Sequence, residues 1–205
     1  MTEGKSLDFN IRLYQPPDLP MLYKICLQTG DHGQDATGQL SDEILGHYYA
    51  APYARYQPEL CFTLLASGAP CGYIVGTSDS TGFSQFFNEE WLPPLLERYQ
   101  LPDLELQTSE AAMVRQLHAG YMPPACTNIY PAHLHINILP IGQGQGNAKQ
   151  MIDLFAEALR TLSASGLHLI VSSRNQRAID FYRAYGFIEV DRNIYSIIFG
   201  LDLEQ

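Results

Sequence analysis

The sequence predicts an α/β fold. Along most of the chain, short strand segments with alternating or continuous apolar residues are separated by segments with helical periodicity, and this interleaving is typical of the α/β class. The last third is the clearest part, because a strand there leads into a glycine-rich turn and then into a long amphipathic helix. With 205 residues, the chain is long enough to bury a stable core without disulfides or metals.

The first half of the sequence predicts a strand, two helices and a hairpin. Ile11 and Leu13 alternate with polar residues, as in a half-buried strand. The two strands of the hairpin are joined by the turn-forming residues Ser-Gly-Ala-Pro at 67–70. The expected elements are a strand over 9–14, a helix over 18–28, a helix from Ser41 towards Tyr53, and strands over 60–66 and 71–77.

Residues 80–130 have the least regular pattern. The segment 83–100 is aromatic and partly helical, and two consecutive prolines interrupt it. A further helix is predicted over 109–121, with Ser109 as its N-cap. We therefore expect one domain, 1–205, with an insertion around 80–130.

The last third alternates between strands and helices. Apolar residues form a stripe along the first of its two helices, and glycines (Gly166 and Gly186) are expected to end both helices. The expected elements are a strand over 132–139, a helix over 148–162, a strand over 167–171, a helix over 176–185, and strands over 187–190 and 195–203.

The turn between the first strand and helix of this third suits the phosphates of a ligand. Its sequence at 141–147 is Ile-Gly-Gln-Gly-Gln-Gly-Asn; glycines let a backbone approach a ligand closely, and the first amides of a helix attract anions. A P-loop is excluded because no Gly-Lys-Ser/Thr is present. A dinucleotide fingerprint is excluded because its last glycine is missing and no acidic residue closes the next strand.

Residues 143–148, Gln-Gly-Gln-Gly-Asn-Ala, match the pyrophosphate motif [Q/R]-x-x-G-x-[G/A] of the GNAT family of N-acetyltransferases. Residues 175–187 also match that family's N-x-x-A-x-x-F-Y-x-x-x-G-F pattern. Over nearly its full length the chain resembles a GNAT subgroup that includes bacterial proteins similar to the acetyltransferase-like domain associated with O-GlcNAcases. The resembling segments are TGDHGQDATG, GHYYAAPY, PAHLHINILP and SSRNQRAIDFYRAYGF.

This resemblance implies a GNAT fold, in which a mixed, mostly antiparallel sheet is flanked by helices on both faces. It also implies acetyl-CoA as the co-substrate, with no metal. The pantetheine arm would pair with the strand near Ile138, and Asn175 would reach that arm from across the site. The pyrophosphate would lie on the backbone amides of Gln143, Gly144, Gln145, Gly146, Asn147 and Ala148.

Acetyl transfer to an amine needs a held oxyanion, an acid for the leaving thiolate and a route for the amine proton. The family resemblance assigns the oxyanion donor to a backbone N–H near Ile138 and the acid to Tyr182. A phenol with a pKa of ~10 stays protonated at neutral pH and can donate to a thiolate whose conjugate acid has a pKa of ~8.5. The alternative role of Tyr182 is as an aromatic core residue beside Phe181.

His133 and His135 are candidates for the base. They alternate along a strand, so both side chains face one side of the sheet, and histidine has a suitable pKa of ~6.5. Serotonin-type acetyltransferases use two histidines on this strand, although their register against the glycine loop differs by one residue, which a β-bulge would restore. Alternatively, the pair packs under a helix as neutral, hydrogen-bonded side chains. We expect no metal site, because no third ligand has a recognisable spacing.

The acceptor side is predicted from two segments. Asp31, His32 and Asp35 lie in the loop 29–38, where acidic groups would attract a cationic amine; residues of these types also simply favour turns. Trp91 is the only tryptophan and would stack on a sugar or aromatic acceptor, or else belong to a satellite core.

The composition limits the partners. Against 22 acidic residues there are 12 basic ones, for a formal charge of −10, which argues against nucleic acid as a partner and suits a basic acceptor. The four cysteines form no C-x-x-C pair, which favours a reducing compartment. No apolar run approaches the ~18 residues of a membrane span, so we expect no transmembrane helix. We expect a cytoplasmic protein with no membrane partner.

The predicted function is acetyl-CoA-dependent N-acetyl transfer to a primary amine, namely a small molecule, an amino sugar or a lysine, by direct attack. The alternative is a catalytically silent pseudo-acetyltransferase that acts as a CoA-binding or protein-interaction module. A homodimer is open, because dimers are common in the family that the chain resembles.

Overall fold

The computed structural model describes residues 7–204 and places its strands in one seven-stranded sheet with the order β1-β2-β3-β4-β5-β7-β6. All neighbouring strands are antiparallel except β4 and β5, which are parallel. The mixed, mostly antiparallel sheet expected above is therefore confirmed. The strands are β1 (Phe9–Leu13), β2 (Phe62–Ala66), β3 (Ala69–Thr77), β4 (Ala132–Ile138), β5 (Gly166–Ser172), β6 (Ile188–Arg192) and β7 (Ser196–Asp202).

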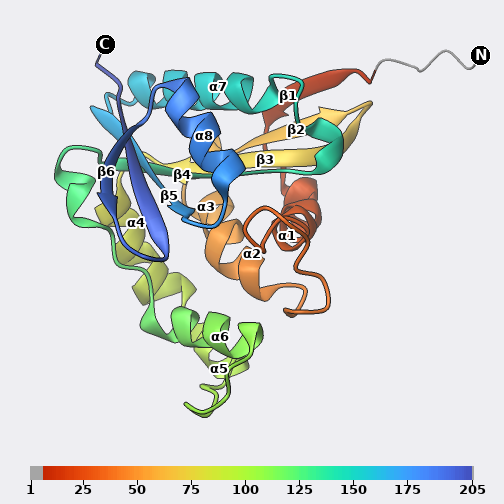
Figure 1. Ribbon diagram of the computed structural model, residues 1–205, viewed down its shortest axis with the longest axis vertical. Coiled ribbons are helices and arrows are strands. Elements are labelled where there is room, and N and C mark those ends of the chain that lie inside the picture. Colours follow the sequence, from red (N-terminus) through yellow and green to blue (C-terminus); the bar gives the residue numbers. More distant parts are fainter. Residues whose placement is uncertain (1–6, 205) are drawn as a thin grey trace, which may run out of the picture.

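Helices cover both faces of this sheet (Figure 1). One face carries α7 and α8, and the other carries the helices that precede β4 in the chain. The two-sided arrangement predicted from the sequence is thus also confirmed. The helices are α1 (Leu19–Leu27), α2 (Ile44–Tyr49), α3 (Ala51–Tyr56), α4 (Ser80–Phe86), α5 (Pro93–Arg98), α6 (Ser109–Ala119), α7 (Asn147–Thr161) and α8 (Gln176–Tyr185).

Each face has its own core because side chains alternate along the central strands. On β3, Ile74 faces α7, whereas Tyr73 and Val75 face the other helices, and all three are fully buried. Close approach of α7 depends on Gly76, since a Cβ there would lie 2.5 Å from Cζ of Phe155 and 2.1 Å from a strand carbonyl oxygen. The same alternation on β4 decides which of its residues face the site described below.

Three local predictions were wrong. The helix expected from Ser41 to Tyr53 is two short helices, α2 and α3; the chain bends between them at Ala50, and Pro52 in the first turn of α3 has no N–H to continue a helix. The N-cap of α6 is Thr108, whose hydroxyl accepts from the Ala111 amide at 3.1 Å, and not Ser109. Gly166 is the first residue of β5, while Ser163, with φ +59°, follows the end of α7.

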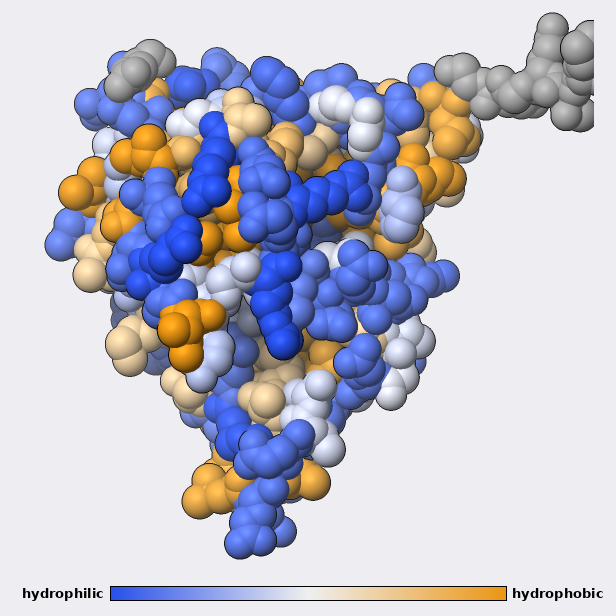
Figure 2. All heavy atoms as spheres, in the orientation of Figure 1, coloured by the Kyte–Doolittle hydropathy of each residue, from blue (hydrophilic) through white to orange (hydrophobic). Residues whose placement is uncertain are grey.

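Residues 80–130 form α4, a π-helical turn over Phe87–Trp91, α5 and α6 on the face opposite α7. They are tied to α2 through Tyr48, whose hydroxyl donates to the Gly120 carbonyl at 3.0 Å. The surface in Figure 2 is mostly hydrophilic, with apolar side chains gathered at the tip beside α5 and α6. The exposed residues of that tip include Leu101, Leu104 and Leu106. No helix within residues 7–204 has the length and apolarity needed to cross a bilayer.

Candidate active site

Strands β4 and β5 part in the middle of the sheet. Their ladder has two residue pairs, Ala132 with Leu167 and His133 with His168. On its other edge, β4 stays paired with β3 as far as Ile138. The last half of β4 is therefore fixed on one side and separated from β5 on the other, and it leads directly into the glycine loop.

The glycine loop has the backbone geometry of an anion cradle. Gly144 and Gly146 have φ values of +77° and +79°, and a Cβ at either position would meet no atom within 4 Å, so open space lies above them. Gly146 is the N-cap of α7. Within the described part of the chain, the backbone amides of residues 144–149 donate to no acceptor. Free amides at a helix N-terminus are the groups that bind phosphates.

Side chains of the loop hold this conformation. Asn147 is buried and donates from Nδ2 to the Gly142 carbonyl at 2.9 Å. Gln143 donates from Nε2 to the Ile138 carbonyl at 2.6 Å, and its Oε1 accepts a hydrogen bond from Arg177 on α8. The predicted donor residues on β4 and the loop are thus contiguous in space, and Arg177 joins them from a different element.

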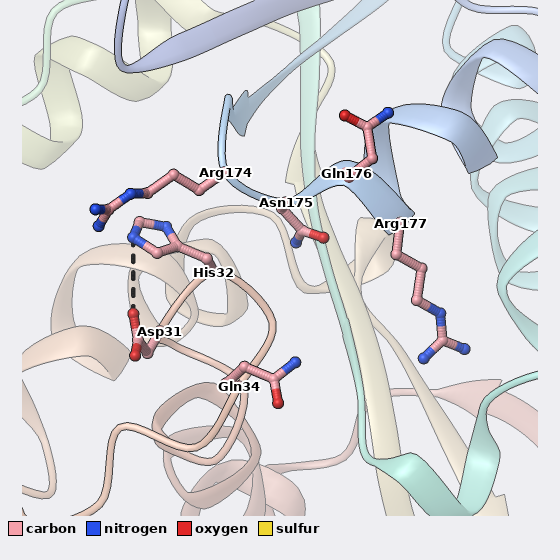
Figure 3. Close-up of a pocket in the computed structure, with 7 residues that line it drawn as sticks. All are labelled: Asp31, His32, Gln34, Arg174, Asn175, Gln176 and Arg177. Carbon is pink, nitrogen blue, oxygen red and sulfur yellow. Dashed lines mark ion pairs between the residues drawn. The ribbon is translucent and has the colours of Figure 1, made fainter.

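A pocket of about 430 Å³ lies between the 29–38 loop and the connection from β5 to α8 (Figure 3). Three of the predicted residues line it: Asp31, His32 and Asn175. Sequence reasoning missed the other lining residues, which are Gln34, Arg174, Gln176 and Arg177. The sequence did contain a signal for three of them, because Arg174, Gln176 and Arg177 lie within the segment SSRNQRAIDFYRAYGF, which matches the family pattern.

Asn175 caps α8 on one wall of the pocket and lies close to Gly33 on the other wall. Its Oδ1 accepts from the Ala178 amide at 3.2 Å and so caps α8. Across the pocket, Gly33 has a φ of +93°, and a Cβ there would lie 3.1 Å from Nδ2 of Asn175. The loop backbone can approach Asn175 this closely because residue 33 has no side chain.

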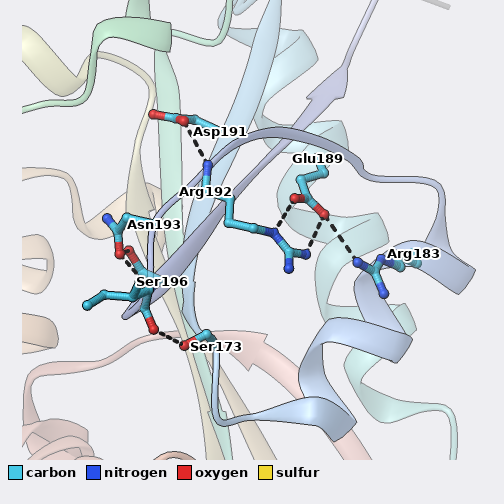
Figure 4. A network of polar contacts seen from close by, with 8 residues as sticks. Ser173, Arg183, Glu189, Asp191, Arg192, Asn193 and Ser196 are labelled. Atoms are coloured by element: carbon cyan, nitrogen blue, oxygen red, sulfur yellow. Dashed lines mark hydrogen bonds and ion pairs between the residues drawn. The ribbon is translucent and has the colours of Figure 1, made fainter.

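The wall that carries Asn175 is braced by the turn between β6 and β7 (Figure 4). Ser173 donates from its hydroxyl to the Ile194 carbonyl and from its amide to the Tyr195 carbonyl, both at 2.9 Å. On the same network, Glu189 pairs with Arg183 and Arg192. The Ser173 contacts hold the segment that leads into α8, whereas Arg183 lies in the last turn of that helix.

The pocket carries charges of both signs. Asp31 Oδ1 lies 3.7 Å from His32 Nε2, and both side chains are partly exposed. Arg174 and Arg177 add two cations to the pocket, in a chain with a formal charge of −10. Such a pocket can attract an anionic ligand on one wall and a cationic one on the other.

Two predicted acceptor residues do not line this pocket. Asp35 Oδ1 accepts from the Thr37 amide at 2.8 Å, and hydrogen bonds from the Thr37 side chain and from this amide lower the pKa of the Asp35 carboxyl. Trp91 donates from Nε1 to the His47 carbonyl at 2.8 Å and packs against the core on its side of the sheet. Asp35 therefore has the geometry of a turn residue and Trp91 that of a partly buried core residue.

Tyr182 is a residue of α8 that is buried in the core, with 8% of its surface exposed. Its ring contacts Phe181, Phe187 and Phe199. Its hydroxyl makes no hydrogen bond to residues 7–204 and is not among the buried unpaired atoms, so it keeps some contact with solvent. Burial raises the pKa of Tyr182. The phenol is therefore protonated at neutral pH.

His133 and His135 face the same side of β4, as predicted, opposite α7. The β-bulge suggested above is absent from this strand, since the register of β3 with β4 is continuous from His133 to Ile138. Burial lowers the pKa of both histidines, to about 4 for His135. Both are neutral, hydrogen-bonded side chains at pH 7. Within residues 7–204, no group of His, Cys, Asp and Glu is arranged to hold a metal ion.

Comparisons with known proteins agree with this geometry. The Acetyltransferase (GNAT) family matches residues 30–187. The crystal structure of SsHAT has a TM-score of 0.89 and 30% identity, and the alignment covers 97% of this chain and 100% of that one. Protein O-GlcNAcase from Rattus norvegicus and from Mus musculus are each 25% identical over 185 residues, which is 89% of this chain and 20% of theirs. The chain thus spans about a fifth of the length of these curated relatives.

More distant structures share the fold. One of them, yncA from Salmonella typhimurium, was solved with its cofactor acetyl-CoA. It has a TM-score of 0.56 and 11% identity, with 96% of this chain and 95% of that chain covered. The ribosomal-protein-S18-alanine N-acetyltransferase of Escherichia coli has a TM-score of 0.55 and 17% identity, with 97% and 96% covered.

Proposed function

The chain belongs to the acetyltransferase (GNAT) family, and from this premise we propose that it transfers the acetyl group of acetyl-CoA to a primary amine by direct attack. The observation that carries the proposal is the glycine loop. Free amides from residues 144–149 and open space over two left-handed glycines lie at the end of a strand that has parted from its neighbour. A pyrophosphate needs such donors, and a pantetheine arm needs an unpaired strand edge.

The donor would be bound by residues from three elements. The amides of Gly144 to Ala148 would hold the pyrophosphate, with Arg177 adding a positive charge. The Gln143 amide would take part only by leaving the Pro140 carbonyl, to which it donates at 3.2 Å. Asn175 would contact the pantetheine arm between β4 and β5. The carbonyl of Ile138 now accepts from Gln143 Nε2, so pairing of the arm with Ile138 requires the Gln143 side chain to move away.

The reaction needs a proton donor and a proton acceptor on this chain. Tyr182 supplies the acid, because its hydroxyl is protonated and has no partner among the described residues. A backbone N–H near Ile138 supplies the oxyanion donor. His133 and His135 are the candidates for removing the proton from the amine.

The acceptor is proposed to be a cationic amine, such as a small-molecule amine, an amino sugar or a lysine. Asp31, beside His32 on the pocket wall, is placed to attract it, and the formal charge of −10 favours a basic partner over nucleic acid. Neither Asp35 nor Trp91 lines the pocket. Each would contact the acceptor only if its segment of the chain moved.

A second function is a silent pseudo-acetyltransferase that binds CoA or a protein partner. The observation that favours it is the enclosure of His133, which has 3% of its surface exposed and packs against the rings of Tyr53, Phe83 and Tyr121. A buried histidine pair with low pKa is also what a purely structural polar cluster would show.

Calorimetric titration with acetyl-CoA, and with CoA in parallel, tests the donor site. Micromolar binding of both supports the proposal, and turnover of an amine panel beginning with amino sugars and polyamines then supports catalysis over the silent alternative. Donor binding without turnover of any amine favours the pseudo-acetyltransferase. Absence of binding by either ligand would overturn the donor site.

A further inference from the structure

A chain of hydrogen bonds runs from α4 to the site where β4 and β5 part. Ser80 Oγ lies 2.6 Å from the Pro131 carbonyl oxygen and 2.7 Å from Nδ1 of His133. Nε2 of His133 lies 2.8 Å from the Tyr53 hydroxyl, which lies 3.1 Å from Nε2 of His135. Ser80, Tyr53 and His133 are fully or almost fully buried.

The shortest contacts of this chain fix one order of donors and acceptors; the Tyr121 hydroxyl is a more distant neighbour of His133, 3.3 Å from Nδ1 and 3.5 Å from Nε2. A carbonyl oxygen has no proton, so the 2.6 Å contact requires Ser80 to donate to Pro131. Ser80 has no second proton, and Nδ1–H of His133 must therefore donate to Ser80. Neutral His133 then has its lone pair on Nε2, and the Tyr53 hydroxyl donates to it. The Tyr53 oxygen in turn accepts from His135, which must carry its proton on Nε2.

The order leaves Nδ1 of His135 as a free lone pair. This atom has no hydrogen-bond partner among residues 7–204. It is also not one of the fully buried atoms that lack a partner, and the His135 side chain is partly exposed. The last β4–β5 pair is His133 with His168, and His135 is the next residue of β4 on the same face. His135 therefore lies on the part of β4 that has separated from β5.

The surroundings of His135 keep it neutral. The titratable groups that face it are Tyr49 from α2, Tyr53 from α3, His133 from its own strand and His168 from β5. None of these groups is charged at neutral pH, since burial raises the tyrosine pKa values and lowers those of the histidines. His135 is therefore unprotonated at neutral pH, and its Nδ1 keeps its lone pair.

We infer that Ser80, His133 and Tyr53 are positioning residues that hold His135 in its Nε2–H tautomer, so that Nδ1 of His135 takes the proton of the amine. The inference rests on the proposed function. An ammonium acceptor first loses one proton to solvent; the neutral amine nitrogen then bonds to the carbonyl carbon and gives its next proton to Nδ1, while the carbon–sulfur bond breaks and the sulfur takes the proton of Tyr182. His135 and Tyr182 then return to their starting states by exchange with solvent. Of the two histidines, His135 alone is catalytic.

The tautomers are measurable without any ligand. In the ¹⁵N-histidine NMR spectrum of the full chain, His135 is expected as Nε2–H, with its signals identified by their loss in His135→Asn. His133 is expected as Nδ1–H. His168 serves as an internal reference, because its Nδ1 lies 2.7 Å from the Tyr130 carbonyl and must carry the proton. An Nδ1–H form or a mixture at His135 would overturn the inference.

Two tyrosines that touch His135 give a matched pair of variants. Tyr53→Phe removes the oxygen that fixes the tautomer, whereas Tyr49→Phe removes a hydroxyl that accepts from Gln116 and leaves the ring edge on His135. We expect Tyr53→Phe to convert His135 to a tautomer mixture and to lower kcat by about tenfold or more, with the KM for acetyl-CoA unchanged. We expect Tyr49→Phe to change neither the His135 tautomer nor kcat.

Ser80→Ala provides a second variant if Tyr53→Phe does not fold, as judged by its unfolding temperature. It acts at the other end of the chain and is expected to shift the His133 and His135 tautomers together. Unchanged kcat in a folded Tyr53→Phe or Ser80→Ala protein would overturn the positioning role while leaving acetyl transfer intact. If no amine is acetylated by the wild type, the catalytic role falls with the proposed function, and only the tautomer assignments stand.

Discussion

Arg177, in the first turn of α8, donates a hydrogen bond to Oε1 of Gln143 in the glycine loop. Gln143 donates in turn to the carbonyl of Ile138, the last residue of β4. One glutamine side chain therefore connects the two sequence motifs of the site, and it does so at the strand carbonyl that the donor arm is proposed to use. Binding of the donor would exchange these contacts for contacts with the ligand, which releases the Arg177 guanidinium to a phosphate.

Arg177→Ala is accordingly expected to weaken acetyl-CoA binding by about tenfold, because one charge-assisted contact is lost. The loss should shrink at high salt, since added ions screen the same interaction. Calorimetry at low and high ionic strength measures both effects. Arg183→Ala is the matched control on the same helix, because Arg183 pairs with Glu189 away from the loop. Equal affinities of the two variants would contradict the assignment of Arg177.

The elements that the sequence predicted best carry local signals. Helix α8 was predicted over 176–185 and has those bounds, because Asn175 caps its start and Gly186, with φ +118°, ends it. The break between α2 and α3 was missed because the apolar residues on both sides pack into one core and so have a continuous helical pattern. Pro52 was the local signal of the break, since it has no N–H to continue a helix.

The site shows the same limit. Asp31, His32 and Asn175 were predicted from two separate segments and do share a pocket. The enclosure of His133 was not visible in the sequence, because it depends on Tyr53, which lies 80 positions away in the chain. Trp91 was predicted from its residue type and its place in an aromatic segment, and its indole N–H is satisfied by a backbone carbonyl. Residue type shows what a side chain can do, whereas its partners depend on distant segments.

Gly146→Glu tests the anion cradle. The change should abolish acetyl-CoA binding, because a carboxylate would fill the open space above the loop and repel the pyrophosphate. Gly68→Glu is the control for backbone strain: Gly68 also has a positive φ, +86°, with no atom within 4 Å of a Cβ, but lies in the turn between β2 and β3. Calorimetry should show a loss of affinity in the first variant only. Donor affinity that survived Gly146→Glu would refute the cradle.

Tyr182→Phe tests the acid. We expect a fall in kcat on the order of a hundredfold, as for loss of a general acid, with the Kd for acetyl-CoA nearly unchanged. The unfolding temperature should stay close to that of the wild type, because the Tyr182 hydroxyl has no hydrogen bond to lose. Tyr185→Phe removes a hydroxyl that donates to Asp153 on the protein surface, and its kcat should match the wild type. Equal rates for Tyr182→Phe and wild type would remove Tyr182 from the mechanism.

Asp18 provides a stability prediction that is independent of catalysis. Its buried carboxylate accepts two hydrogen bonds from Arg12, at 2.6 and 2.8 Å, one from the Gln15 amide at 2.9 Å and one from Thr63 at 3.2 Å. The Arg12 hydrogen bonds are the main reason that the pKa of Asp18 is lowered in the folded chain. These contacts join β1, β2 and the start of α1.

Because the folded pKa of Asp18 lies below its unfolded value of ~3.9, the unfolded chain takes up the proton first as the pH falls. The stabilisation is therefore complete well above pH ~4 and is lost as the pH falls through the folded pKa. Asp18→Asn should lower the free energy of unfolding by about 2–4 kcal/mol at pH 7, and the difference from wild type should narrow below pH ~4. Urea unfolding across pH 3–8 measures this difference. Glu157→Gln, in an exposed pair with Arg160, should change stability by less than ~0.5 kcal/mol at every pH; a difference for Asp18→Asn that did not vary with pH would show that the carboxylate charge is not what stabilises this contact.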